Sequence, residues 1–324
     1  MTPLLARRLL FVSGKGGTGK STVAAALAEL AVQRGLRTLV CEMDAKGALA
    51  GAFEVAELGF VPREIHPGLF AMVMNTEDSL REYLRLFVRI PLVGGRLGPL
   101  AHMFDFVADA APGVKEILGV GKLCYEVRER HYDLVIVDAE ASGHIVAQID
   151  APRAIRELVQ VGMVREQTDW MIEILDDPTQ TGLVVVTTPE EMPVIETVEL
   201  VDRVRSVTGI DVAAVIANRV LPQWFMSGGG SAFSALTSPA AQPVLAAAAG
   251  ANVATVVHAA RLTHARAVAA GEHFAHLRRD LPAGIPVFDV PELFTRSGGR
   301  RVVSLVAAVL AGRLLESPSQ EAGC

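Results

Sequence analysis

Short apolar runs alternate with amphipathic stretches along much of the chain, and most of these runs end in glycine or a polar residue. Runs of this length, bounded by turn residues, are typical of strands that are buried on both faces. We predict strands at Leu9–Val12, Thr38–Glu42, Leu69–Met74, Leu134–Val137, Leu183–Val186 and Val212–Ala217. Polar side chains follow several strands, with Asp44 after the second, Asp138 at the end of the fourth and Asn218 after the last.

The segments between these strands favour helices, because their apolar residues recur at helical spacing. We expect helices at Lys20–Arg34, where Gly35 stops the pattern, after Pro189 through Val207, and at Arg300–Leu315. Residues 77–130 have no strong strand pattern and predict a helical insertion. Ser227–Gly250 is rich in glycine, serine and alanine, which predicts a partly mobile loop.

Strands that alternate with helices predict an α/β fold, with a doubly wound, mostly parallel sheet flanked by helices. We expect one domain over residues 1–324. The helical insertion 77–130, together with part of 228–260, is its candidate partner-binding subdomain. Ligands of such sheets bind beyond the carboxyl ends of the strands. The strand-end polar residues are therefore candidates for a common site.

A phosphate-binding loop follows the first predicted strand. The run Gly14-Lys15-Gly16-Gly17-Thr18-Gly19-Lys20-Ser21-Thr22 satisfies G-x-x-x-x-G-K-[ST] and opens a helix, which is the context the motif requires. Glycines allow backbone N–H groups to point at phosphates, and the helix N-terminus favours negative charge. We expect Lys20 to contact the β- and γ-phosphates of ATP, Ser21 to ligate Mg²⁺ and Thr22 to lie near the α-phosphate.

Two strand-end carboxylates complete the predicted site. Asp138 follows four apolar residues, the pattern of a carboxylate that holds Mg²⁺ through water. Asp44 could orient or deprotonate the attacking water, or it could cap a helix. Lys15 is a second lysine in the loop, in a position where the loop itself does not require a cation.

The form G-K-G-G-T-G-K resembles the deviant Walker A motif of the MinD/ParA, nitrogenase-reductase and arsenite or tail-anchored-protein ATPases. In those proteins the lysine that corresponds to Lys15 reaches the partner subunit's nucleotide. The segment Asp138 to His144 resembles switch II, D-x-x-x-[ST]-G-H, of the arsenite-translocating and tail-anchored-protein-targeting ATPases. The resemblance implies that Ser142, Gly143 and His144 sense the γ-phosphate, although His144 could simply begin a helix.

Further segments resemble the same ArsA-like family in order and spacing. Asp44, Leu49, Ala52 and Phe53 match its switch I, Pro112-Gly113 with Glu116 matches a P-G-x-x-E segment, and Thr187–Glu190 with Glu196-Thr197 matches a strand–helix connection. The resemblance implies that Asn218 reads adenine and that Ile285–Leu293, including Pro291, is a loop over the base. Asn218 could instead be a strand-end turn residue.

The chain also departs from that family. It lacks the C-x-x-C of the targeting factors, which binds a zinc ion between subunits, and its cysteines 41, 124 and 324 are scattered. It has one phosphate loop, whereas the arsenite pump subunit has a tandem duplication. Zinc-linked pairing and activation by metalloids are therefore not expected.

Composition excludes several classes of protein. The formal net charge is −6 and the pI is about 5.8, which argues against general nucleic-acid binding. The scattered cysteines fit a reducing cytoplasm, and we find neither a signal peptide nor an integral membrane segment.

We therefore expect an ATPase that binds ATP and Mg²⁺ in a nucleotide-sandwich dimer, either a homodimer or a heterodimer with a paralogue. It would act in the cytoplasm or at a membrane surface, and would couple ATP hydrolysis to binding of a client with a hydrophobic segment, or to anion transport. Apolar residues of the helical insertion could line a client surface or form a local core: Leu80, Leu84, Leu86, Phe87, Leu92, Met103, Phe104 and Phe106.

The alternative is a MinD/ParA-like positioning ATPase acting at a membrane or on DNA. The last predicted helix could serve such a role, since Val302, Val303, Val306, Leu310 and Leu314 form an apolar side. A helix that binds at a membrane surface usually carries a face rich in lysine and arginine. The few arginines of this helix lie at its ends, which favours packing in the core.

Overall fold

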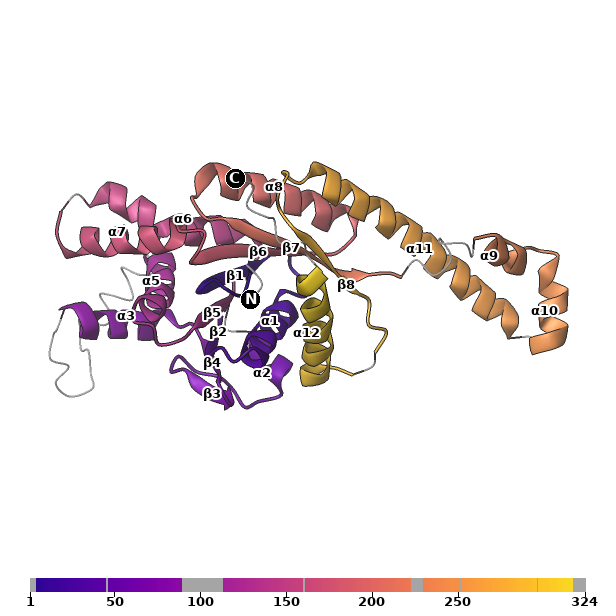
Figure 1. Cartoon of the computed structure of the whole chain (residues 1–324), viewed down its shortest axis with the longest axis horizontal. Helices are drawn as coiled ribbons and strands as arrows, with labels where there is room; N and C mark the ends of the chain where they lie inside the picture. The colour runs from indigo at the N-terminus through magenta and orange to yellow at the C-terminus, as the bar shows by residue number, and fades with distance from the viewer. Residues whose placement is uncertain are drawn as a thin grey trace.

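The computed structural model describes residues 4–44, 46–88, 113–159, 161–222, 230–250, 252–295 and 297–316. Eight strands form one sheet in the order β3-β4-β2-β5-β1-β6-β7-β8 (Figure 1). The strands are β1 (Leu9–Ser13), β2 (Thr38–Glu42), β3 (Arg63–His66), β4 (Leu69–Val73), β5 (Leu134–Asp138), β6 (Thr181–Thr187), β7 (Val212–Val220) and β8 (Val287–Pro291). All neighbouring pairs are parallel except β3 with β4. This confirms the predicted doubly wound α/β architecture.

The central strands β1, β2, β5 and β6 are buried along their full length, which explains why continuous apolar runs mark them in the sequence. Two edge strands lie outside the predicted set. β3 reads Arg-Glu-Ile-His and is largely exposed, so it has no apolar run. β8 lies inside Ile285–Leu293, which we expected to be a loop, and it pairs with β7. That expectation is wrong for Val287–Pro291.

Helices cover both faces of the sheet (Figure 1). On one face lie α1 (Lys20–Gln33), α2 (Ala48–Phe53) and α12 (Gly299–Glu316). On the other lie α5 (Val114–Arg128), α6 (Ser142–Leu158), α7 (Met163–Asp176) and α8 (Glu191–Val207). Five apolar residues of α12 are buried, namely Val303, Val306, Ala307, Leu310 and Leu314. The preferred prediction for this last helix, core packing, is confirmed.

The helical insertion begins with α3 (Thr76–Tyr83), continues as a π-helical segment (Leu84–Val88) and ends with α5. Asn75 caps α3, because its side-chain oxygen accepts a hydrogen bond from the backbone N–H of Asp78 at 3.0 Å. The predicted client-surface residues Leu92, Met103, Phe104 and Phe106 lie outside the described residues. Among the helices that the structure describes, none combines the length and apolarity needed to cross a bilayer.

A helical arm extends from the opposite end of the sheet (Figure 1). It consists of α9 (Gly230–Thr237), α10 (Ala241–Ala249) and the long helix α11 (Val253–Asp280). The predicted loop at Ser227–Gly250 is therefore wrong for residues 230–237 and 241–249. Alanine, the strongest helix former, dominates α10, and this propensity outweighs the loop signal of the neighbouring glycines and serines. Figure 1 also shows this arm far from α3 and α5, although the sequence analysis groups the two as one candidate subdomain.

Candidate functional site

The phosphate loop connects β1 to α1, as predicted. Gly14 has φ +145°, and a Cβ atom there would overlap the carbonyl oxygen of Val186 on β6. Gly17 and Gly19 also have positive φ. The loop is therefore pressed against the neighbouring strand in a conformation that requires glycine. Since no side chain caps α1, its first N–H groups remain available for an anion.

The loop is held by its own side chains and by residues distant in sequence, among them Asn218. The Thr18 hydroxyl donates to the carbonyl oxygen of Lys15 at 2.9 Å, and Lys20 Nζ donates to the same oxygen at 3.4 Å. Asn218 Nδ2 donates to the carbonyl oxygen of Thr18 at 2.8 Å. Burial lowers the pKa of Lys20, while the nearby charge of Asp138 opposes that shift. The Lys20 ammonium thus lies against the backbone of its own loop, and we call Gly14–Thr22 together with Asp138 the cradle.

A hydroxyl and a carboxylate meet beside Lys20, as expected for a Mg²⁺ site. Ser21 donates a hydrogen bond to Asp138, which is 5% exposed at the end of β5. Burial raises the pKa of Asp138 to about 6, against the opposing effects of Ser21 and Lys20. These oxygen ligands suit Mg²⁺, which binds through few protein ligands and several waters. The residues present therefore fit ATP with Mg²⁺.

We expect Asp138→Asn to stabilise the nucleotide-free protein at pH 8. The pKa of Asp138 is about 6 in the folded protein against an ordinary value of 3.8, so deprotonation penalises the folded state increasingly as pH rises between them. Removing the charge should raise the unfolding free energy at pH 8 by up to about 3 kcal/mol, and by less at pH 5. Urea unfolding without Mg²⁺ measures this, with the exposed residue Asp202→Asn as control. A loss of stability at pH 8 would contradict the prediction.

A carboxylate that was not predicted as a site residue lies just before switch I. Glu42 is 2% exposed at the end of β2, and its two oxygens accept from the backbone N–H groups of Lys46, Ala48 and Leu49 at 2.7–3.1 Å. It thereby holds the turn that follows Asp44. The sequence carries one signal for such a role of Glu42, because the buried strand β2 continues through Leu39-Val40-Cys41 and then ends in glutamate.

Asp44 itself is more exposed and forms an ion pair with Lys46. Lys46 lies between Asp44 and Leu49 and is not among the residues that match the switch I of the family. The side chain of Asp44 therefore does not cap α2, because Glu42 accepts from the N–H groups there. Its predicted role toward the attacking water stays a prediction.

The start of switch II lies against the phosphate loop. The Ser142 N–H donates to the carbonyl oxygen of Gly14 at 3.1 Å, and the Ser142 hydroxyl contacts Glu196 Oε2 at 3.5 Å. Glu196, on α8, also forms an ion pair with Lys15. Both charged side chains remain about a third exposed, at 32% for Lys15 and 30% for Glu196. Glu196 thus links the second lysine of the loop to switch II.

The structure places the other switch II residues at the surface. The His144 side chain is 77% exposed, and its Nδ1 lies 4.0 Å from Glu140 Oε2. Gly143 has open space around it and so could accommodate movement of the loop. Both residues lie in the first turn of α6. Their predicted role in sensing the γ-phosphate stays a prediction.

A pocket of about 610 Å³ with both polar and apolar walls is lined by the sequence neighbours of Asn218 and Pro291, the two residues expected near the base. These neighbours are Arg219 and Glu292, and the other walls include the start of α8 and residues 266–273 in the middle of α11. The side chain of Asn218 is already engaged, since its oxygen accepts from the Arg219 N–H at 3.0 Å. Recognition of adenine by Asn218 would require this side chain to share or exchange its contacts.

Cys41 and Cys124 are buried. Burial raises the pKa of the Cys124 thiol to about 12, and the pKa of Cys41 is raised for the same reason. Thiols of this kind stay protonated and do not readily bind metal. In the part of the chain that the structure describes, no three histidine, cysteine or acidic side chains converge on a metal position.

The sequence matches the family model described as anion-transporting ATPase over residues 7–167 and 154–227. This match contains the phosphate loop, both switches, Glu196 and Asn218. It ends before the arm and the last helix.

Named relatives agree with the family match. "ATPase BagA" of Mycobacterium tuberculosis is 30% identical over 226 residues, 66% of this chain and 66% of that protein. "Putative arsenical pump-driving ATPase" of Halobacterium salinarum is 27% identical over 69% of this chain and 37% of that protein. "ATPase ASNA1 homolog" of Entamoeba histolytica is 22% identical over 66% of this chain and 76% of that protein. The similarity thus spans just under two thirds of the mycobacterial relative.

Proposed function

Because this chain belongs to the anion-transporting ATPase family, we propose that it binds ATP with Mg²⁺ at Gly14–Thr22 and hydrolyses it as a face-to-face pair of subunits. We further propose that the cycle opens and closes a binding site for a client with an apolar segment. This activity would take place in the cytoplasm.

Each residue of the cradle has a role in this proposal. The N–H groups at the start of α1 and the Lys20 ammonium bind the phosphates, and Ser21 and Asp138 hold Mg²⁺ directly or through water. When bound, Mg²⁺ neutralises charge that develops on the phosphates. Asp44 exchanges its contact with Lys46 for the attacking water, which it orients.

The observation that carries the paired arrangement is the position of Lys15. Its ammonium does not enter the cradle of its own subunit, where Lys20 already lies. It instead pairs with Glu196 at the surface and remains partly exposed. A cation of the phosphate loop that pairs with a residue outside the loop is available to a nucleotide on a facing subunit. Closure would transfer Lys15 from Glu196 to that nucleotide, and Ser142 would lose its contact with Glu196 if the carboxylate moves.

Two substitutions should shift ATP-dependent pairing in opposite directions. Lys15→Ala should weaken pairing and slow hydrolysis, since the facing nucleotide loses a cation. Glu196→Gln should strengthen pairing by about two- to fivefold, because an exposed ion pair worth up to about 1 kcal/mol no longer restrains Lys15. Sedimentation velocity with Mg²⁺ and a non-hydrolysable ATP analogue measures both.

Glu199→Gln, an exposed glutamate on the same helix, is the matched control. The effect of Glu196→Gln should vanish in the Lys15→Ala background if the two residues act together. Unchanged pairing and hydrolysis in Lys15→Ala would refute the face-to-face arrangement.

An apolar pocket in the helical insertion supports the client step. It has a volume of about 280 Å³ between α3, α5, α6 and α7, and two of the candidate client residues, Leu80 and Leu86, contribute to its lining. Leu84, another predicted client residue, is instead buried, and Phe87 is not described at the side-chain level. A pocket of this size would hold side chains of a client segment rather than a whole helix.

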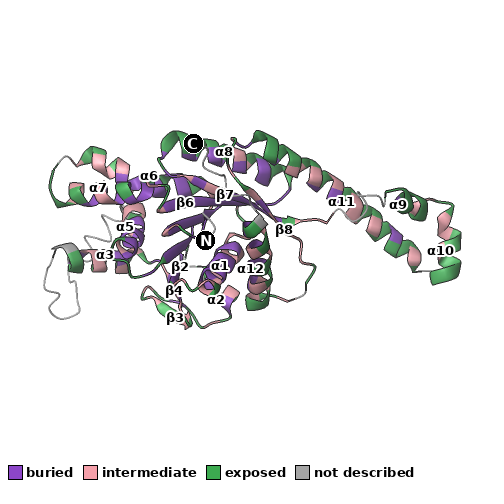
Figure 2. Ribbon diagram, in the orientation of Figure 1, coloured by how far each residue is buried: buried purple, intermediate pink, exposed green. Residues whose placement is uncertain are grey.

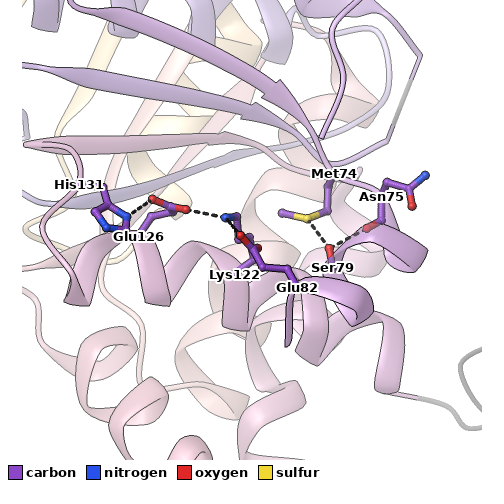
Figure 3. Close-up of polar contacts among 7 residues, drawn as sticks. All are labelled: Met74, Asn75, Ser79, Glu82, Lys122, Glu126 and His131. Carbon is purple, nitrogen blue, oxygen red and sulfur yellow. Dashed lines mark hydrogen bonds and ion pairs between the residues drawn. The ribbon is translucent and has the colours of Figure 1, made fainter. Parts of the chain in front are cut away.

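A partly buried charge cluster joins the two helices of the pocket wall, α3 and α5 (Figure 3). Lys122 Nζ contacts Glu82 Oε1 at 2.8 Å and Glu126 Oε1 at 2.6 Å, and Glu126 Oε2 lies 2.7 Å from His131 Nδ1. Burial would lower the pKa of Lys122, but hydrogen bonds with Glu126 and Glu82 raise it above its usual value. Lys122 therefore stays charged and ties α3 to α5.

The same wall touches switch I. A Cβ atom on Gly119 of α5 would lie 2.9 Å from the terminal methyl of Met43, the residue before Asp44. The Met43 N–H also donates to the carbonyl oxygen of Asp138 at 3.0 Å. A movement of Asp44 or Asp138 on nucleotide binding would therefore press directly on the helix that lines the pocket. This contact is the proposed route from ATP to client.

A further inference from the structure

The turn after β2 carries a cation that the proposed mechanism has so far given no task. Lys46 forms an ion pair with Asp44, and its side chain is 75% exposed. Its backbone is anchored, because Glu42 accepts the Lys46 N–H at 2.7 Å. Glu42 ends β2, which is buried along its full length in the sheet (Figure 2). Lys46 is therefore a cation in contact with solvent on a fixed stretch of backbone.

This turn begins at the edge of the cradle. Glu42 and Asp138 are register partners on the neighbouring strands β2 and β5. The Met43 N–H donates to the carbonyl oxygen of Asp138 at 3.0 Å, and the Asp138 side chain accepts from Ser21 in the phosphate loop. The backbone that carries Lys46 is thus connected to the predicted Mg²⁺ position by direct hydrogen bonds.

The charges of the turn also act on the phosphate loop. Burial is the main cause of the lowered pKa of Lys20, and the Lys46 ammonium lowers it further, while Asp138 and Asp44 oppose the shift. The two ammonium groups therefore repel each other in the nucleotide-free protein. An anion close to both would relieve this repulsion, since an opposite charge favours the charged form of each lysine.

We propose that Lys46 is the residue by which one subunit distinguishes ATP from ADP, because its ammonium leaves Asp44 and binds the γ-phosphate. The proposal rests on the proposed binding of ATP at Gly14–Thr22 and gives a role to a residue outside that loop. ADP has no γ-phosphate, so with ADP the pair of Lys46 and Asp44 persists. With ATP, Asp44 loses the cation that occupies it and becomes free to orient water.

The exchange of partners is favourable because the ion pair that it breaks is weak. The side chains of Lys46 and Asp44 are 75% and 53% exposed, so water screens their attraction. A terminal phosphate carries more negative charge than one carboxylate and offers three acceptor oxygens. A lysine ammonium lies on a flexible stem, so it can change partners while Glu42 keeps the backbone of the turn in place.

The two lysines of the phosphate loop do not supply this discrimination within one subunit. Lys20 donates to a carbonyl oxygen of its own loop at 3.4 Å, and its proposed contacts include the β-phosphate, which ADP also has. Lys15 pairs with Glu196 and is proposed to serve the facing subunit. Lys46 is thus the cation of switch I whose proposed contact depends on the γ-phosphate alone.

Calorimetric titration of the full chain with Mg²⁺ and either ADP or a non-hydrolysable ATP analogue tests this inference. Lys46→Met should lower the preference for the analogue over ADP by about three- to thirtyfold, the value of one charge-assisted hydrogen bond less the lost ion pair. Affinity for ADP should change by less than about twofold, since only an exposed pair is removed. Lys46→Arg keeps the charge and should keep most of the preference. Lys115→Met, at an exposed lysine on α5, is the matched control and should have no effect.

Two further comparisons separate this role from subunit pairing and from a structural role. In the Lys15→Ala background, where pairing should be weak, Lys46→Met should still lower the preference by the same factor. Asp44→Asn releases Lys46 and should raise the preference for the analogue by about two- to fivefold. This gain should disappear in the double variant Asp44→Asn with Lys46→Met, if the two residues act together.

The inference is overturned if Lys46→Met keeps the wild-type preference, if it weakens ADP binding as much as analogue binding, or if its effect vanishes in the Lys15→Ala background. Faster hydrolysis by Lys46→Met with an unchanged preference would also overturn it, because Lys46 would then only block Asp44. Failure of the ATP site itself would appear separately: the wild type would bind neither nucleotide, and this inference would fall with it.

Discussion

Lys20→Ala should lower the turnover number for ATP by about 10²–10³-fold, the usual cost of removing one preorganised group that stabilises transition-state charge. Lys20 lies at the first position of α1, next to Ser21 and near the buried carboxylate of Asp138. Neither neighbouring lysine should replace it, since Lys15 pairs with Glu196 and is proposed to serve the facing subunit, while Lys46 is exposed and pairs with Asp44. Phosphate release at saturating ATP measures the loss.

The same variant also tests the client step. ATP-dependent capture of a fluorescent peptide with an apolar segment of about 20 residues should disappear in Lys20→Ala. Lys115→Ala, an exposed lysine on α5, is the control and should retain both activities. If Lys20→Ala still captures the peptide, and capture still depends fully on ATP, then client binding does not depend on this cradle. That result would contradict the proposal. If ATP hydrolysis drives anion transport instead, the rate of hydrolysis should change on addition of an anion and not on addition of the peptide.

Gly14→Ala should reduce the unfolding free energy by about 2–4 kcal/mol, among the larger losses expected from a single substitution. A Cβ atom at this position would overlap the Val186 carbonyl oxygen, and φ is +145°. Because the obstacle is backbone within the central sheet, it cannot rotate away as a side chain could. The loop must therefore move away from β6, and this displacement should also abolish ATP binding. Urea unfolding and calorimetric titration with ATP and Mg²⁺ measure the two effects.

Gly16→Ala is the matched control within the same loop. A Cβ atom on Gly16 would have no neighbouring atom within 4 Å, and Gly16 is not among the glycines with positive φ. Its substitution should change stability by less than about 1 kcal/mol. Equal losses in the two variants would show that the close approach of Gly14 to Val186 does not determine the loop conformation.

The parts of this protein that could be predicted are those encoded by neighbouring residues. The phosphate loop is nine consecutive residues between an apolar run and a helix, and the core strands are continuous apolar runs. Such signals suffice because backbone conformation and burial at these positions depend on local chemistry. By contrast, β3 is short and exposed, so no pattern of burial marked it.

The contacts that connect the site were decided by tertiary structure. Glu196 meets Lys15 across 181 residues, and Asn218 meets Thr18 across 200 residues. In the sequence, Glu42 and Asp44 are two carboxylates at the end of one strand. The turn after β2 determines that Glu42 accepts the N–H groups of α2 while Asp44 remains outside. The projection of the arm from the sheet is likewise invisible in its alanine-rich sequence, because local propensity specifies a helix but not what the helix packs against.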